Sequence, residues 1–158
     1  MKKNILPIIV SIALVTFCFY KLGSLFSPGS YPYAEVYEIG IRDSLLIERI
    51  KTFKINNPSY DISSKIGLAD DILGQEKKWV MCYFYYKEEN QIIATWVREL
   101  DNNHCQFALV SVNNGIELGK WKYVNHDYGF FDSITERAKF EDRILKPLKV
   151  SYKRRSFF

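Results

Sequence analysis

Hydrophobic and aromatic residues cluster in short runs after residue 30, and polar turns separate most of these runs. Residues 79–86, with the sequence WVMCYFYY, are aromatic or β-branched almost throughout, which is typical of a strand covered on both faces. The motif Asn113-Asn114-Gly115 predicts a hairpin turn, because Asn and Gly tolerate positive φ angles. The predicted strands cover residues 37–41, 79–87, 92–98, 105–112 and part of 116–124.

Two segments have the spacing of amphipathic helices, in which the apolar positions share one arc. The first covers residues 42–54. The second covers residues 134–145, where Ser133 and Glu136 match a capping box and Pro147 ends the helix. The apolar positions are Leu46, Ile47, Ile50 and Phe53 in the first helix, and Ile134, Ala138, Phe140, Ile144 and Leu145 in the second. The predicted fold is α+β: an antiparallel meander of three to five strands with both helices on one face, preceded by an N-terminal transmembrane or signal helix.

The N-terminal segment has the pattern of a membrane anchor. Residues 5–20 carry no charge and follow Lys2 and Lys3. Sixteen helical residues span roughly 24 Å, and the side chain of Lys21 can reach toward the lipid headgroups while later apolar residues lengthen the segment. We therefore predict a signal-anchor helix in residues 1–23.

Two alternatives for this segment stay open. A cleaved signal peptide needs small residues around the cleavage site, and residues 17–24 offer no good pair of them. A lipoprotein would be acylated at Cys18, but Phe17 occupies a position that requires a small residue. The anchor is the interpretation that the residues favour, and Cys18 is the lipidation candidate of the alternative.

Turn-forming residues divide the rest of the chain. Residues 24–33 contain prolines, glycines and serines and predict a linker. Residues 34–148 are the predicted globular domain, and residues 149–158 are a basic and aromatic tail. Because positive residues stay in the cytoplasm, Lys2 and Lys3 predict that the domain lies outside it.

The positive charge is concentrated at the two ends of the chain. The formal net charge is +4, but three basic residues precede residue 31 and five follow residue 145. The 14 basic residues between them are outnumbered by 18 acidic residues. Nucleic-acid-binding domains usually carry a basic face on the fold itself, so we expect no nucleic-acid partner.

The sequence contains no recognisable catalytic or metal-binding constellation. Cys82 and Cys105 lie in apolar strands separated by one strand, too far apart for a disulfide, and are expected to be buried thiols. His104 and His126 lie in turns without the paired ligands of a zinc site. We therefore predict no catalytic residue, no cofactor and no metal, and the sequence favours a protein that is not an enzyme.

Two groups of charged residues are candidate binding residues. Arg137 and Glu141 are i,i+4 partners that project from the apolar arc of the last helix, either as a polar site or as an ion pair at its edge. Lys153, Arg154 and Arg155 lie in the tail, which could add an edge strand or could contact anionic lipid headgroups.

These features indicate a single-pass protein of a bacterial cell membrane, or a secreted, periplasmic or lipidated form of it. The expected function is a non-enzymatic binding module outside the cytoplasm, with the membrane and another protein as partners. An immunity protein and an accessory of envelope assembly both fit. The alternative is a small-ligand-binding or hydrolytic domain for envelope polymers, with Arg137, Glu141, His104 and His126 gathered in a cleft.

Overall fold

The computed structural model describes residues 15–16, 31–71 and 79–155. The chain divides into two compact units, residues 1–32 and 33–158, and the fold below is that of the second unit. The predicted anchor lies outside the described residues except for Val15 and Thr16, and Cys18 lies outside them too. No helix in the described part is long and apolar enough to cross a membrane.

The described residues form one antiparallel sheet of six strands. The strands are β1 (Glu35–Ile39), β2 (Val80–Tyr86), β3 (Gln91–Glu99), β4 (Cys105–Asn114), β5 (Trp121–Tyr123) and β6 (Tyr152–Arg154). Their order is β2-β3-β4-β1-β6, and β5 pairs with β4 beyond the start of β1. The predicted meander of three to five strands therefore holds only for β2 to β5, because β1 and β6 pair across a long sequence separation.

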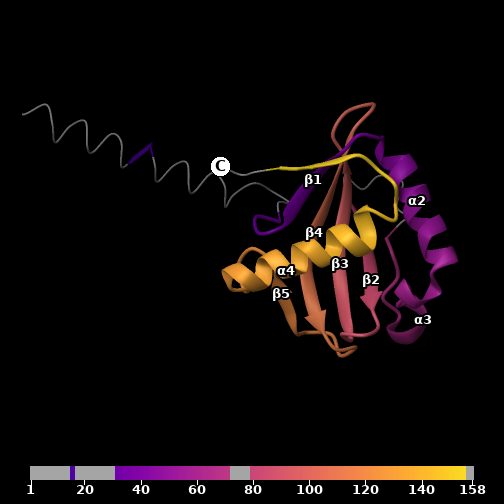
Figure 1. The fold of residues 1–158 in the computed structure, drawn as a ribbon, viewed down its shortest axis with the longest axis vertical. Coiled ribbons are helices and arrows are strands. Elements are labelled where there is room, and N and C mark those ends of the chain that lie inside the picture. The colour runs from indigo at the N-terminus through magenta and orange to yellow at the C-terminus, as the bar shows by residue number, and fades with distance from the viewer. Residues whose placement is uncertain (1–14, 17–30, 72–78, 156–158) are drawn as a thin grey trace, which may run out of the picture. The chain divides into compact units, whose positions relative to one another are not determined.

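Two long helices pack on one face of this sheet, as predicted (Figure 1). They are α2 (Asp43–Asn56) and α4 (Phe130–Phe140), which continues into a π-helical turn, η2 (Glu141–Leu145). Leu46 and Ile50 of α2 share a core with Phe140 of α4 and with Phe84 and Phe107 of the sheet. Between α2 and β2 lie a 3-10 turn, η1 (Pro58–Tyr60), and a short helix, α3 (Ser63–Ile66).

The last helix differs from its prediction at its N-terminal half. It begins at Phe130, and the polar side chains of Ser133 and Glu136 are buried, whereas Ile134 is 43% exposed. The hydroxyl of Ser133 donates to the backbone carbonyl of Val124 (2.8 Å), so it ties the helix to the end of β5 rather than capping it. The predicted apolar arc is correct only from Phe140 onward.

The two cysteines of the domain confirm the expectation of buried, unpaired thiols. Cys82 lies on β2 and Cys105 on β4, with β3 between them, and both side chains are fully buried. Burial raises the pKa of each thiol to about 12. Both residues therefore serve as small core side chains.

Candidate functional site

Two of the predicted candidate residues meet at one buried carboxylate. Glu35 begins β1, and its side chain is only 5% exposed. Its carboxylate accepts hydrogen bonds from Arg137 of α4 (3.3 Å), from Asn125 (3.1 Å) and from Arg154 of β6. A buried carboxylate needs such partners, so this cluster joins α4, β1 and β6 into one unit.

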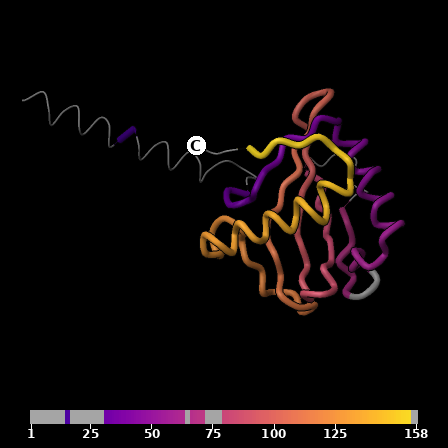
Figure 2. Tube along the Cα trace, in the orientation of Figure 1, coloured from indigo at the N-terminus to yellow at the C-terminus, as the bar shows by residue number. Residues whose placement is uncertain are grey.

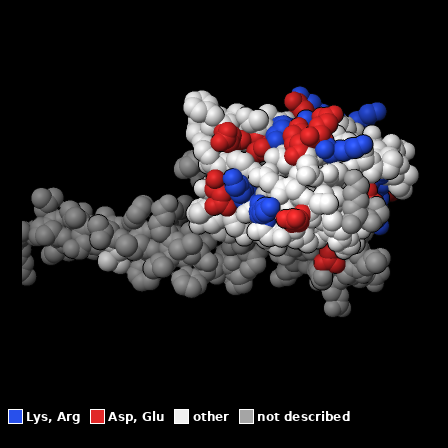
Figure 3. Space-filling model, turned by 90° about the horizontal axis from the view of Figure 1, so that it is seen from below, with Lys and Arg blue, Asp and Glu red and all other residues white. Residues whose placement is uncertain are grey.

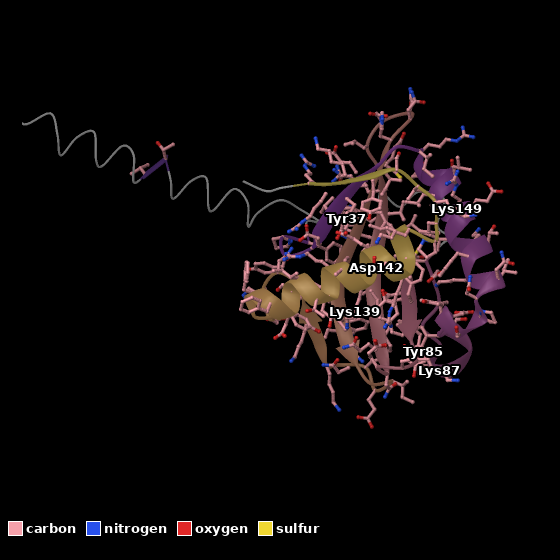
Figure 4. All side chains as sticks on the ribbon, in the orientation of Figure 1. Tyr37, Tyr85, Lys87, Lys139, Asp142 and Lys149 are labelled. Atoms are coloured by element: carbon pink, nitrogen blue, oxygen red, sulfur yellow. The ribbon has the colours of Figure 1, made fainter. Side chains whose placement is uncertain are left out.

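Glu141 belongs to a neighbouring contact and not to an ion pair with Arg137. The hydroxyl of Tyr37 donates to the Glu141 carboxylate at 2.9 Å, and burial together with this carboxylate raises the pKa of Tyr37. Among the described residues, the i,i+4 ion pair that the sequence offered is not formed, because Arg137 points to Glu35 and Asn125 instead. Tyr37 is labelled in Figure 4.

The remaining candidates lie on the edge strand that the tail forms. Lys153 stands opposite Glu38 in the pairing of β6 with β1, and Arg155 lies 3.9 Å from the Glu38 carboxylate. The tail, drawn in yellow in Figure 2, thus returns to the side of β1. Lys153 and Arg155 are exposed.

The two histidines lie at opposite ends of β1. His104 precedes Cys105, which pairs with Ile39 at the end of β1, whereas the ring of His126 packs on Tyr33 just before its start (4.4 Å). Each histidine contacts an aspartate of its own turn, Asp101 or Asp127. Within the described ranges, no group of three or more His, Cys, Asp or Glu residues could hold a metal ion.

A groove of about 740 Å³ lies between α2 and the η2 end of α4. Its apolar lining includes Leu45, Phe53, Tyr60 and Leu148. Arg49 of α2 donates to the carbonyls of Leu148 (3.2 Å) and Lys149 (2.8 Å), which holds the two walls together. Asp142 and Lys149, both in the lining, are labelled in Figure 4.

A polar stripe runs along the α2 wall of this groove. Glu48, Thr52 and Asn56 follow one another at i,i+4 spacing and are all exposed. They therefore lie on one side of the helix and extend over about 12 Å. In the described part of the chain, none of these three side chains has a hydrogen-bond or ion-pair partner. The stripe offers a carboxylate, a hydroxyl and an amide to a bound molecule.

A smaller hollow of about 230 Å³ adjoins the groove through two shared residues, Tyr60 and Arg143. It is also lined by Tyr86, whose buried hydroxyl has no hydrogen-bond partner among the described residues. Burial raises the pKa of Tyr86, so this hydroxyl keeps its proton and remains a donor. Arg143 lies over the Tyr86 ring (4.9 Å to its centre) and pairs with both oxygens of Glu89 at 2.6 and 2.8 Å.

Sequence reasoning did not find the groove. Its two walls are about a hundred residues apart in the chain, and the Arg49 contacts that join them cannot be inferred from local spacing. The available signal was the polar i,i+4 stripe on α2, which by itself is typical of any solvated helix face.

No protein-family model, no curated protein and no solved structure matches this chain.

Proposed function

We propose that this chain is a membrane-anchored, non-enzymatic binding module whose domain lies outside the cytoplasm and holds a segment of a partner protein. The groove between α2 and η2 is the proposed binding site. The signal-anchor pattern of residues 1–23 supports the location, and the polar stripe on α2 supports the kind of ligand.

The observation that carries the proposal is the combination of an apolar lining with unpaired polar groups. Leu45, Phe53 and Leu148 offer apolar contact area, while Thr52 and Asn56 have free hydrogen-bonding groups beside it. A peptide advances by 3.3–3.6 Å per residue, so the stripe matches about four residues of extended chain. Peptide backbones present donors and acceptors in alternation, which suits a hydroxyl and an amide.

The charges near the groove favour a protein over a nucleic acid. The cationic side chains of its lining are accompanied by Glu48 and Asp142, and Arg143 is already paired with Glu89. On the face shown in Figure 3, acidic and basic side chains lie next to one another rather than in a single basic field. A nucleic-acid site would need such a field.

The test is site-specific photo-crosslinking of the full chain in the cells that make it. A photoreactive amino acid at Thr52 lies on the groove wall, and one at Glu117, whose side chain is 83% exposed in the β4–β5 loop, is the matched control. We expect an adduct with one protein from position 52 and none from position 117.

A second variant separates groove recognition from simple proximity. Asn56→Arg places a large cation on the stripe and should abolish the adduct from position 52 without changing the amount of protein. An adduct that is equally strong from position 117, or unaffected by Asn56→Arg, would contradict the groove. Proteolysis of spheroplasts tests the location independently, because full protection of the domain would place it on the cytoplasmic side.

A further inference from the structure

In the first half of α4, polar side chains are buried against the domain and apolar side chains are exposed. Ser133 and Glu136 face the sheet and are buried, while Phe130 and Phe131 are 74% and 79% exposed. Ile134 is 43% exposed on the same outer side of the helix. The two phenylalanine rings stack edge to face on each other, with centres 5.4 Å apart. A helix that only completes the core would place these residues inward, so the exposed side needs another explanation.

This exposed apolar strip lies at the end of the domain where the chain enters it. Tyr33, the first residue of the domain, accepts a backbone hydrogen bond from Asn125 and packs on His126, four residues before α4 begins. The tail leaves the sheet at the same end, because the backbone N–H of Arg155 donates to the carbonyl of Val36 (2.9 Å). Figure 1 shows the start of α4 and the end of β6 on the same side of the domain, with α2 on the other side.

We propose that Phe130, Phe131 and Ile134 insert into the interfacial region of the lipid bilayer that holds the N-terminal anchor. The inference rests on the proposed membrane location. Tyr20, the last residue of the uncharged run, and Tyr33 are 13 residues apart, which limits the distance between membrane and domain to about 45 Å. Phe130 lies seven residues before Arg137, so the strip extends about 10 Å along the helix beyond the Glu35 cluster.

Several features at this end favour a lipid surface over a protein. Tyr123 is 41% exposed and packs on Tyr33, and aromatic rings of this kind concentrate at membrane interfaces. Two exposed basic residues at this end, Lys122 and Arg155, are matched by two exposed acidic residues, Asp127 and Asp132, so the proposed contact rests on apolar insertion and not on a net positive charge. Because the anchor tethers the domain, the local lipid concentration is high, and two or three inserted side chains are enough for contact.

Insertion at this end also orients the proposed binding groove. The groove lies between α2 and the η2 end of α4. Figure 1 shows α2 and the start of α4 at opposite edges of the same sheet. A domain held by Phe130 and Phe131 would therefore present the groove away from the lipid, where a partner protein can reach it.

The experiment uses the full chain with Cys18→Ser, reconstituted into vesicles of phosphatidylcholine and phosphatidylglycerol. An environment-sensitive fluorophore is attached to a single exposed cysteine, I134C in the strip or I55C on α2 as the control, since Ile55 is 78% exposed far along the other helix. Cys82 and Cys105 are fully buried and stay unlabelled. We expect a blue shift at position 134, with quenching by spin-labelled lipid, and an aqueous spectrum at position 55.

The double variant F130S/F131S tests the strip itself, with the fluorophore kept at position 134. Both side chains are exposed, so the domain should fold, and the blue shift should be lost. A chain that floats with the vesicles but shows an aqueous spectrum at position 134 would overturn lipid insertion and leave the anchor intact. A chain that does not float with the vesicles would contradict both the membrane anchor and the lipid insertion. A blue shift that appears only after a partner protein is added would assign the strip to that partner.

Discussion

Lys54, in the last turn of α2, forms an ion pair with Asp70 (2.6 Å) across the outer edge of β2. The ammonium group of Lys54 also donates to the backbone carbonyl of Tyr83 (2.6 Å), and the Asp70 carboxylate accepts the backbone N–H of the same residue (2.8 Å). These are the groups with which another strand would pair. The Lys54–Asp70 pair therefore closes the edge of the sheet at this point.

Removal of this cation should destabilise the domain strongly. The side chains of Lys54 and Asp70 are only 10% and 13% exposed, so Lys54→Met leaves a nearly buried carboxylate without its partner. Breaking such a pair costs about 3 kcal/mol of the free energy of unfolding. Urea denaturation followed by circular dichroism measures it, with Lys51→Met, an exposed position on the same helix, as the control that should change stability by less than about 0.5 kcal/mol.

Removing the charges of both Lys54 and Asp70 separates the effect of the ion pair on stability from the effect of the packing of the lysine side chain. In Lys54→Met with Asp70→Asn, the amide can still accept from Tyr83 and no charge is left buried, so part of the lost stability should return. A double variant that is less stable than Lys54→Met alone would show that the Asp70 carboxylate stabilises the domain even without Lys54.

The central strands could be predicted because each depends on local composition. The apolar run that contains Cys82 and Phe84 forms a buried strand in any arrangement that covers both faces of the sheet. The sequence offered an edge strand as one alternative for the tail, but its pairing with β1 could not be predicted, because it joins positions more than a hundred residues apart. The exposed side of α4 was missed because Ile134 and Phe140 look equally apolar in sequence, and only the contacts of Ser133 show which side faces the sheet.

The candidate residues were identified better than their partners were. Arg137 and Arg154 were candidates by charge and position, yet the carboxylate that joins them, Glu35, has no sequence feature that singles it out. The pairing of β1 with β6 and the path of α4 bring these three residues together. Such a cluster follows from topology and not from spacing along the chain.

The Glu35 cluster should stabilise the domain by holding α4, β1 and β6 together. Glu35→Gln keeps the shape of the side chain but removes the charge that two guanidinium groups share, and hydrogen bonds to a charged group are worth about 2 kcal/mol. We expect a loss of this size in urea denaturation, with no loss of the adduct at position 52. Glu38→Gln, at the exposed contact with Arg155, should be nearly neutral. Equal effects of the two variants would contradict this role.

The buried thiols should make stability fall at high pH. The pKa of Cys82 and of Cys105 is raised to about 12, above the value of about 8.5 for a thiol in an unfolded chain. Between these values the unfolded chain loses protons that the folded domain keeps, so the contribution is constant below about pH 8 and declines as the pH rises. Urea denaturation at rising pH checks this, and Cys105→Ala should show a shallower decline than the parent.

Alkylation of the same thiols provides an independent measurement. In a chain with Cys18→Ser, iodoacetamide should modify both remaining cysteines quickly in urea and at least about a hundredfold more slowly in the native state, because reaction requires opening of the core. Rapid modification of native Cys82 would show that β2 opens locally, and would contradict the closed edge that Lys54 and Asp70 form.

Two buried tyrosines should respond differently to loss of their hydroxyl groups. The Tyr37 hydroxyl donates to Glu141, so Tyr37→Phe should lower the free energy of unfolding by about 1–2 kcal/mol. The Tyr86 hydroxyl is buried without a partner in the described part of the chain, so Tyr86→Phe should be neutral or stabilising by up to about 1 kcal/mol. Because Tyr86 lines the hollow next to the groove, the same variant should weaken the crosslink at position 52 if a partner accepts that hydrogen bond. A Tyr86→Phe variant as destabilised as Tyr37→Phe would mean that the hydroxyl has a partner within the fold, such as a bound water, and that it is not held ready for a ligand.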